Sequence, residues 1–120
     1  MKIYGIGQVF EDGSIIEDYS SAAQFGKTGI GKEGVYYKDG LKKRFAAYGE
    51  IERYFKRVHE VNGKLCCGSA TFAYYKLILI CGGKEITAMM TENEREVDGA
   101  VAGIKAIRPE IPYGFIPREA

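Results

Sequence analysis

The segment from Glu92 to Ile107 places its apolar side chains on one helical stripe, and this limits the fold more than any other stretch of the chain. Thr91 can cap the start of a helix, with Glu94 three residues later completing a capping box. Arg108-Pro109 ends it, because proline disfavours helical geometry at the residue before it. The stripe comprises Val97, Ala100, Val101, Ile104 and Ile107. A helix with one apolar stripe has to cover another element.

The chain before this helix reads as short strands separated by glycine turns. Asp12-Gly13, Asp39-Gly40 and Gly82-Gly83 are turn dipeptides that tolerate positive φ. Strands are predicted over residues 2–10, 27–31, 35–38, 41–47, 74–81 and 84–90, with a second short strand starting at Ile15-Ile16 and a loop over 20–24. The sequence therefore predicts a mainly β (α+β) domain that ends in one helix, at about residues 92–107.

Residues 51–61 fit two structures. Ile51, Tyr54, Phe55 and Val58 have helical spacing, yet the segment also fits a long twisted strand. We favour the strand, because Asn62-Gly63 is a type I′ hairpin signal that requires a strand on each side. Leu65-Cys66-Cys67 is then the returning strand.

Size, charge and cysteine content restrict the function classes. The 120 residues fit one domain, and a net charge of +1 offers no global attraction for nucleic acid, so no nucleic-acid partner is expected. Three cysteines, two of them adjacent, make a poor disulfide framework and favour a reducing, cytoplasmic location. The N-terminus lacks the apolar run of a signal peptide.

Catalytic and cofactor motifs fail on spacing or context. Residues 29–34 spell G-x-G-x-x-G, but a strand rather than a helix follows, so we interpret these residues as hairpin glycines. Gly26-Lys27-Thr28 resembles the end of a phosphate-binding loop but lacks the preceding glycine. His59 lies in a charged stretch and is predicted to be exposed. We expect no enzyme activity, no cofactor and no metal.

Residues 38–57 hold seven basic and three acidic side chains. In a meander, Lys42 and Arg44 share one face, and Arg53 and Arg57 share a face of the next strand. These four residues are the candidate ligand-binding site, suited to a phosphate or an acidic partner. The alternative is a solvated outer sheet face on which charged side chains protect an edge.

The order of elements resembles the pleckstrin-homology-like (PH-like) fold of small bacterial proteins. The resemblance rests on three stretches: residues 31–37 as turn and aromatic strand, Ala47-Tyr48-Gly49-Glu50-Ile51 as the turn into the next strand, and the closing helix. It implies an antiparallel barrel of two orthogonal sheets with the C-terminal helix as its cap. The expected organisation is an N-terminal extension over 1–25, a PH-like domain over 26–108 and an extended tail over 109–120. Residues 1–25 and Ala47, where proline is frequent, depart from the family pattern; the extension can cover a sheet edge or pair with another chain.

The resemblance implies binding rather than catalysis. Bacterial relatives often self-associate, so we expect a protein partner or a homo-oligomer. Eukaryotic PH domains that hold inositol phosphates use basic residues around their first hairpin, which here offers Lys27, Lys32 and Lys38 without a tight cluster. The alternative is a binder of phosphate-bearing ligands or of an anionic membrane surface through the 38–57 cluster.

Overall fold

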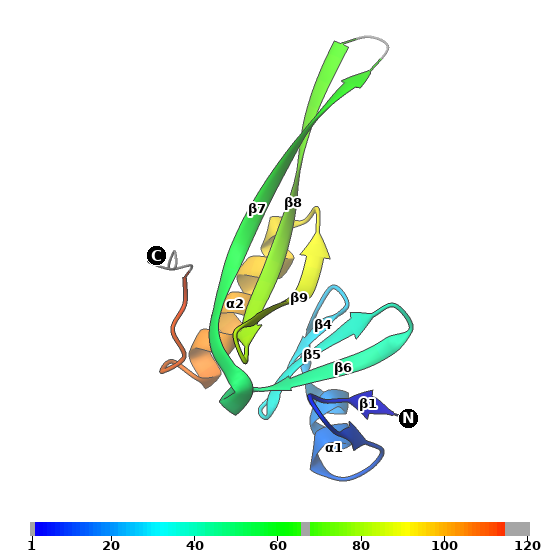
Figure 1. The fold of residues 1–120 in the computed structure, drawn as a ribbon, viewed down its shortest axis with the longest axis vertical. Helices are drawn as coiled ribbons and strands as arrows, with labels where there is room; N and C mark the ends of the chain where they lie inside the picture. The colour runs from blue at the N-terminus through cyan, green and yellow to red at the C-terminus, as the bar shows by residue number, and fades with distance from the viewer. Residues whose placement is uncertain (1, 66–67, 115–120) are drawn as a thin grey trace.

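A computed structural model describes residues 2–65 and 68–114, and side chains within 61–72 are not discussed. The elements, in chain order, are β1 (Ile3–Tyr4), β2 (Val9–Phe10), α1 (Ser14–Ser21), β3 (Ala23–Phe25), β4 (Thr28–Ile30), β5 (Gly34–Asp39), β6 (Lys42–Ala47), a 3₁₀ turn (Tyr48–Glu50), β7 (Ile51–Leu65), β8 (Gly68–Cys81), β9 (Lys84–Thr91) and α2 (Glu94–Ile107). The prediction of a mainly β domain with a C-terminal helix is confirmed (Figure 1).

The strands form two sheets. The first has the order β2-β1-β6-β5-β4-β3, and the second has the order β7-β8-β9. The two sheets are not closed into a barrel, so the predicted barrel is wrong. Between β4 of the first sheet and β9 of the second, a side-chain hydrogen bond replaces backbone pairing. The Thr28 hydroxyl donates to the Ala88 carbonyl at 2.6 Å, and both residues are buried. That carbonyl on β9 is thereby satisfied without a neighbouring strand.

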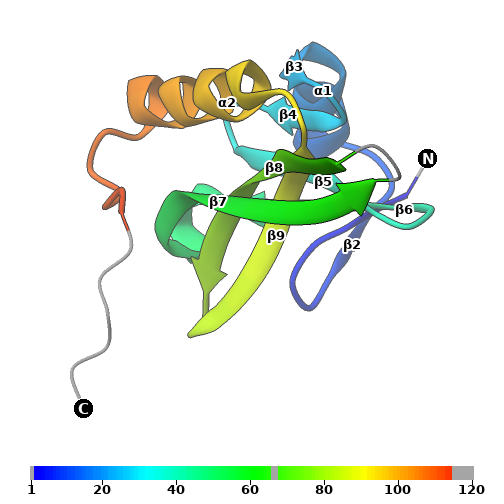
Figure 2. The same cartoon turned by 90° about the horizontal axis from the view of Figure 1, so that it is seen from above.

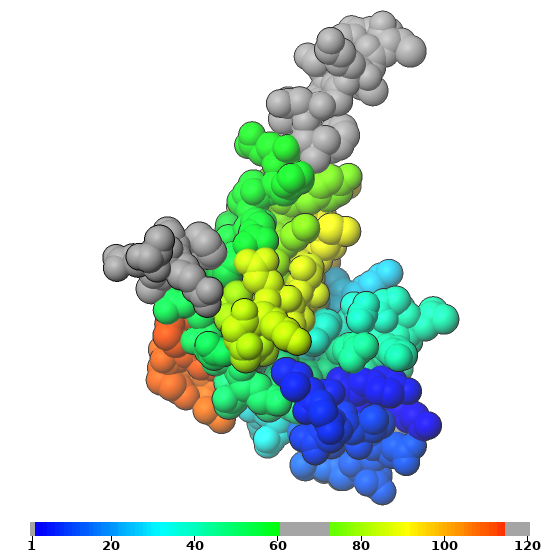
Figure 3. Space-filling view, viewed as in Figure 1, coloured from blue at the N-terminus to red at the C-terminus, as the bar shows by residue number. Residues whose placement is uncertain are grey.

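Residues 1–25 have a place in the first sheet. β1 pairs in parallel with β6, and β3 pairs antiparallel with β4, so this segment covers both outer strands of the β4–β6 meander. The predicted single strand over 2–10 is two short strands, and the predicted strand at Ile15-Ile16 is the start of α1. Ile15 and Ile16 pack against the buried pair Tyr36 and Phe45. Figure 3 shows the N-terminal residues lying against the β5–β6 hairpin.

The terminal helix α2 lies across the three-stranded sheet and reaches β3 and β4 (Figure 2). Val97, Ala100, Val101 and Ile104 of the predicted stripe are buried, whereas Ile107 is 37% exposed. The predicted cap is wrong. Asn93 caps the helix, its side-chain oxygen accepting from the Arg95 amide at 3.1 Å, because Thr91 still belongs to β9.

Residues 51–61 are a strand, as predicted, but the predicted Asn62-Gly63 turn is wrong. β7 continues through both residues to Leu65, and Asn62 pairs with Thr71. Leu65 therefore ends β7 instead of beginning the return strand, and Cys66 and Cys67 lie outside the described residues. The turns at Asp39-Gly40 and Gly82-Gly83 are confirmed, since Gly40, Gly82 and Gly83 all have positive φ between paired strands. Gly13 also has positive φ, but it precedes α1 instead of joining two strands.

Candidate functional sites

The G-x-G-x-x-G segment is a hairpin, as predicted, and its loop binds an anion that the chain itself supplies. The Asp18 carboxylate accepts hydrogen bonds from the backbone amides of Lys32 and Glu33 at 2.8 and 2.9 Å. It also accepts one from the Tyr36 hydroxyl at 2.8 Å. A Cβ on Gly31 would lie 2.2 Å from an Asp18 oxygen, so this position requires glycine. The loop amides are therefore occupied and are not a free phosphate site.

Burial keeps the tyrosines beside this loop protonated. Desolvation, reinforced by the hydrogen bond to Asp18, raises the pKa of Tyr36 far above its usual value. Desolvation also raises the pKa of Tyr48, whose hydroxyl donates to the Gly31 carbonyl at 2.6 Å. Both phenols consequently remain hydrogen-bond donors, and they serve the structure of the loop.

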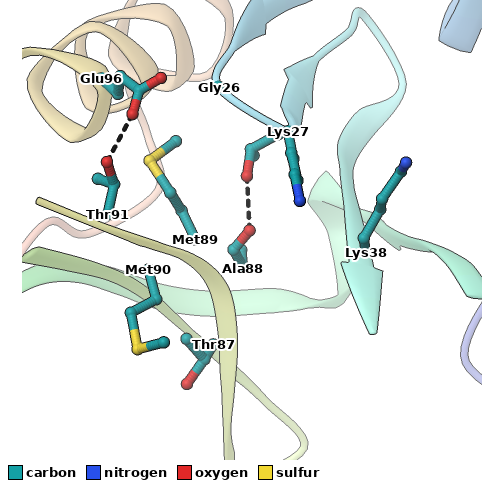
Figure 4. A pocket seen from close by; sticks show the side chains of 10 residues that line it. Gly26, Lys27, Lys38, Thr87, Ala88, Met89, Met90, Thr91 and Glu96 are labelled. Atoms are coloured by element: carbon teal, nitrogen blue, oxygen red, sulfur yellow. Dashed lines mark hydrogen bonds between the residues drawn. The ribbon is translucent and has the colours of Figure 1, made fainter. Parts of the chain in front are cut away.

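A hollow of about 460 Å³ opens between the two sheets (Figure 4). Its walls come from the β3–β4 turn, β5, β9 and α2, and its lining residues are Gly26, Lys27, Thr28, Lys38, Thr87, Ala88, Met89, Met90, Thr91 and Glu96. Gly26 has φ +61° and lies against the Glu96 carboxylate, where a Cβ would be 2.6 Å from the nearest oxygen. The turn thus approaches α2 closely and directs Lys27 along the hollow.

The charges in this first hollow are unevenly neutralised. Glu96 accepts a hydrogen bond from the Thr91 hydroxyl at 2.5 Å. Within the described part of the chain, neither Lys27 nor Lys38 forms an ion pair. Two ammonium groups beside the Thr87 hydroxyl can receive a small anion, whereas the Thr91 hydroxyl already donates to Glu96.

A second hollow, of about 510 Å³, adjoins the first and shares Lys38 and Thr87 with it. Its charges are largely paired. The Arg44 guanidinium lies 3.3 Å from Asp39, in poor geometry for a hydrogen bond, and Glu85 is bound by Arg57. The lining residues are Tyr4, Gly5, Ile6, Gly7, Tyr37, Lys38, Asp39, Arg44, Phe45, Glu85, Ile86 and Thr87.

The four predicted ligand-binding residues are divided between the two sheets. Lys42 and Arg44 lie on β6, whereas Arg53 and Arg57 lie on β7, which does not pair with β6. The 3₁₀ turn at Tyr48–Glu50 carries the chain from one sheet to the other, so the assumed meander of these two strands is wrong.

Each of the four has a partner within the chain. Lys42 lies over the Tyr4 ring, 5.2 Å from its centre, and Arg44 lies beside Asp39. Arg53 donates to the Gly114 carbonyl at 3.3 Å. Arg57 binds both oxygens of Glu85, at 3.1 and 2.8 Å, which lowers the pKa of that carboxyl. His59 is exposed, as predicted.

The second sheet contains an arm, which we define as Glu60–Leu65 of β7 and Gly68–Ala73 of β8. β9 ends at Thr91, opposite Tyr75, whereas β8 extends beyond this level as far as its first residue, Gly68, at the top of Figure 1. Among the described residues, the arm is therefore a two-stranded ribbon without a third strand on either edge. A hollow of about 410 Å³, lined by Ala73, Tyr74, Tyr75 and Glu92, lies where β9 stops.

Two of these features were accessible in the sequence. Lys27 and Lys38 are among the basic residues that the family resemblance assigns to the first hairpin, and both line the first hollow. Residues 68–75 form an uncharged run, and this pattern marks a strand edge without charge protection.

Among residues 2–65 and 68–114, no group of three or more His, Cys, Asp or Glu side chains could hold a metal ion. No described helix has the length and apolarity needed to span a membrane. No protein-family model, curated protein or solved structure matches the chain.

Proposed function

We propose that the protein is a non-catalytic, PH-like interaction module that associates with itself. The order of elements supports the PH-like part of the proposal: an antiparallel meander β3–β6, a second meander β7–β9 and a final helix α2. This is the order that the family resemblance implies. β1, β2 and α1 are additions to it.

The observation that carries self-association is the arm. Isolated two-stranded ribbons are marginally stable in water, and exposed strand edges present unpaired backbone groups that template pairing with another chain. The arm consists of such a ribbon, whereas β8 is buried only further along, from Leu77 to Leu79, where β9 pairs with it. A further strand paired with one edge of the arm would stabilise it, and another protein chain can supply that strand.

Light scattering on the purified full chain tests this proposal. A dimer or larger oligomer at tens of micromolar is expected, with a mass that falls on dilution. A monomer throughout that range contradicts the proposal.

The second candidate function is the binding of phosphate-bearing ligands or anionic surfaces. The unpaired ammonium groups of Lys27 and Lys38 favour the first hollow as its site. Lys42, Arg44, Arg53 and Arg57, which the sequence suggested, already have partners within the chain.

Retention on heparin or on anionic vesicles tests this candidate. Retention that weakens with salt and falls after Lys27→Glu with Lys38→Glu supports it. Lys32→Glu with Lys84→Glu, at two exposed positions outside the first hollow, makes the same change in net charge and is the matched control. Retention that is equal in both variants, or that responds only to Lys42→Glu with Arg44→Glu, excludes the first hollow as the site.

A further inference from the structure

The two edges of the arm differ in their protection against pairing. β7 carries the exposed Glu60 within the arm, and charged side chains discourage another strand from joining an edge. The facing stretch of β8, Gly68 to Ala73, has neither a charge nor a proline. The β8 edge is therefore the one open to a further strand.

The hydrogen-bond phase of β7 shows which backbone groups face outward. The Tyr54 amide donates to the Pro112 carbonyl at 3.2 Å, and the Tyr54 carbonyl accepts from the Gly114 amide at 2.9 Å, so Tyr54 faces away from β8. The β7–β8 register has no shift beyond Arg53. The direction of the backbone groups alternates with period two along a strand. The amides and carbonyls of Asn62 and of its partner Thr71 therefore also point away from the β7–β8 ladder, toward the outer edges of the ribbon.

The same phase holds for the neighbours of Thr71 on β8. Ser69 and Ala73, two positions away on either side, also direct their backbone groups toward the bare edge. Tyr75, the next in this series, is opposite Thr91 and belongs to the β8–β9 ladder. The bare edge thus offers three residues with outward amides and carbonyls.

We propose that a second copy of this chain adds its own β8 to this edge, antiparallel, about a two-fold axis through Thr71. This inference rests on the proposed self-association and names its surface. Ser69 then pairs with Ala73 of the second copy, and Thr71 pairs with its own equivalent, which uses all three outward residues in both chains. The result is a continuous sheet of four strands, in the order β7, β8, β8 and β7.

The shape of the molecule leaves room for this arrangement. In the proposed register, the Gly68 end of the second copy lies beside Tyr74, next to the hollow of about 410 Å³ where β9 stops. This hollow lies at the position that a longer β9 would fill. The added strand takes that place without displacing β9, whose pairing begins at Tyr75.

Proline at Thr71 tests the interface, because it removes an outward amide without breaking the β7–β8 ladder. Asn62→Pro is the matched control: it lies at the same level of the arm and removes an outward amide from the other edge. We expect Thr71→Pro to raise the dimer dissociation constant roughly 30-fold, through the loss of two hydrogen bonds across the axis. Asn62→Pro leaves it unchanged.

Cross-linking provides a readout that poor folding cannot imitate. With Cys66 and Cys67 replaced by serine, Thr71→Cys places two thiols at directly opposed positions, where the Cα separation of about 5.5 Å suits a disulfide. A reducible covalent dimer from Thr71→Cys, and none from Asn62→Cys, is expected.

The outcomes separate this inference from the proposed function. A dimer that survives Thr71→Pro, one lost equally in both proline variants, or equal cross-linking of both cysteine variants overturns the inference and leaves self-association standing. A monomeric wild-type chain overturns both.

Discussion

Replacing Asp18 tests the idea that the chain supplies its own anion to the loop over residues 31–34. Asp18 is 7% exposed and accepts three hydrogen bonds, from two backbone amides and the Tyr36 hydroxyl. Asp18→Ala leaves these donors without their acceptor in a largely dry site, and an unsatisfied buried donor costs about 1–3 kcal/mol. Because water can reach part of the space vacated by the side chain, we expect a loss of about 3–5 kcal/mol in the free energy of unfolding.

Asp18→Asn separates charge from shape. It keeps one carbonyl oxygen as an acceptor and turns an NH₂ group toward the remaining donors, so a loss of about 2–3 kcal/mol is expected. Asp12→Ala, at an exposed carboxylate just before α1, is the control and should change stability by less than about 0.5 kcal/mol.

Urea unfolding followed by circular dichroism measures these differences. Tyr36→Phe, and the double variant that combines Asp18→Asn with Tyr36→Phe, complete a double-mutant cycle. The expected coupling between the two side chains is about 1–2 kcal/mol. An Asp18→Ala loss below about 1 kcal/mol would refute the account of the loop, because a buried acceptor of three hydrogen bonds cannot be removed so cheaply.

Three further predictions concern pH, thiol chemistry and helix capping. Burial raises the pKa of Tyr36, Tyr48 and the other core tyrosines, Tyr37 and Tyr54. Their contribution to stability is therefore complete below about pH 10 and is lost as the pH rises further, because the tyrosines of the unfolded chain ionise first. Urea titrations between pH 9 and 11 should show the free energy of unfolding fall, and fall less steeply in Tyr48→Phe. Burial raises the pKa of the Cys81 thiol to about 11, so with Cys66 and Cys67 replaced by serine the folded chain should react with Ellman's reagent at pH 8 far more slowly than the urea-unfolded chain; equal rates contradict the buried placement. Asn93→Ala should cost about 1 kcal/mol of stability through loss of the α2 cap, and an unchanged unfolding midpoint would show that the cap contributes nothing.

The terminal helix and the strand over 51–61 were predictable because their signals are local. The spacing of Val97, Ala100, Val101 and Ile104 is a property of the sequence alone, and so is a run of β-forming residues. The position of the β7–β8 turn was not predictable in this way. Asn62-Gly63 is a strong turn signal, yet the observed register extends both strands beyond it, which shows that pairing along the whole ribbon outweighs one dipeptide.

Helix α1 could not be predicted because its stabilising contacts are tertiary. It has eight residues, and Gly13 precedes it without a side-chain cap. Isolated helices of this length are unstable in water, so its formation depends on packing. Ile15 and Ile16 supply apolar contacts, and Asp18 binds the loop more than ten residues away.

The candidate site was predictable only in part, because neighbours in sequence became separated in space. Lys42 and Arg57 belong to one basic stretch, but the 3₁₀ turn at Tyr48–Glu50 sends their strands into different sheets. Conversely, Lys27 and Lys38 line one hollow with residues of β9 because the sheets meet there. Which strands share a sheet depends on contacts between residues far apart in the sequence, and the local sequence pattern does not predict it.

The role of the arm is tested most directly by shortening it. Replacing residues 62–71 with Asn-Gly closes the ribbon at the Val61–Phe72 pair, which has the same hydrogen-bond phase as the Leu65–Gly68 pair that closes it in the wild type. Both β9 and the core remain intact in this variant. By light scattering at equal concentration, the account predicts a dimer for the full chain and a monomer for the shortened one. Equal masses for the two proteins would contradict it.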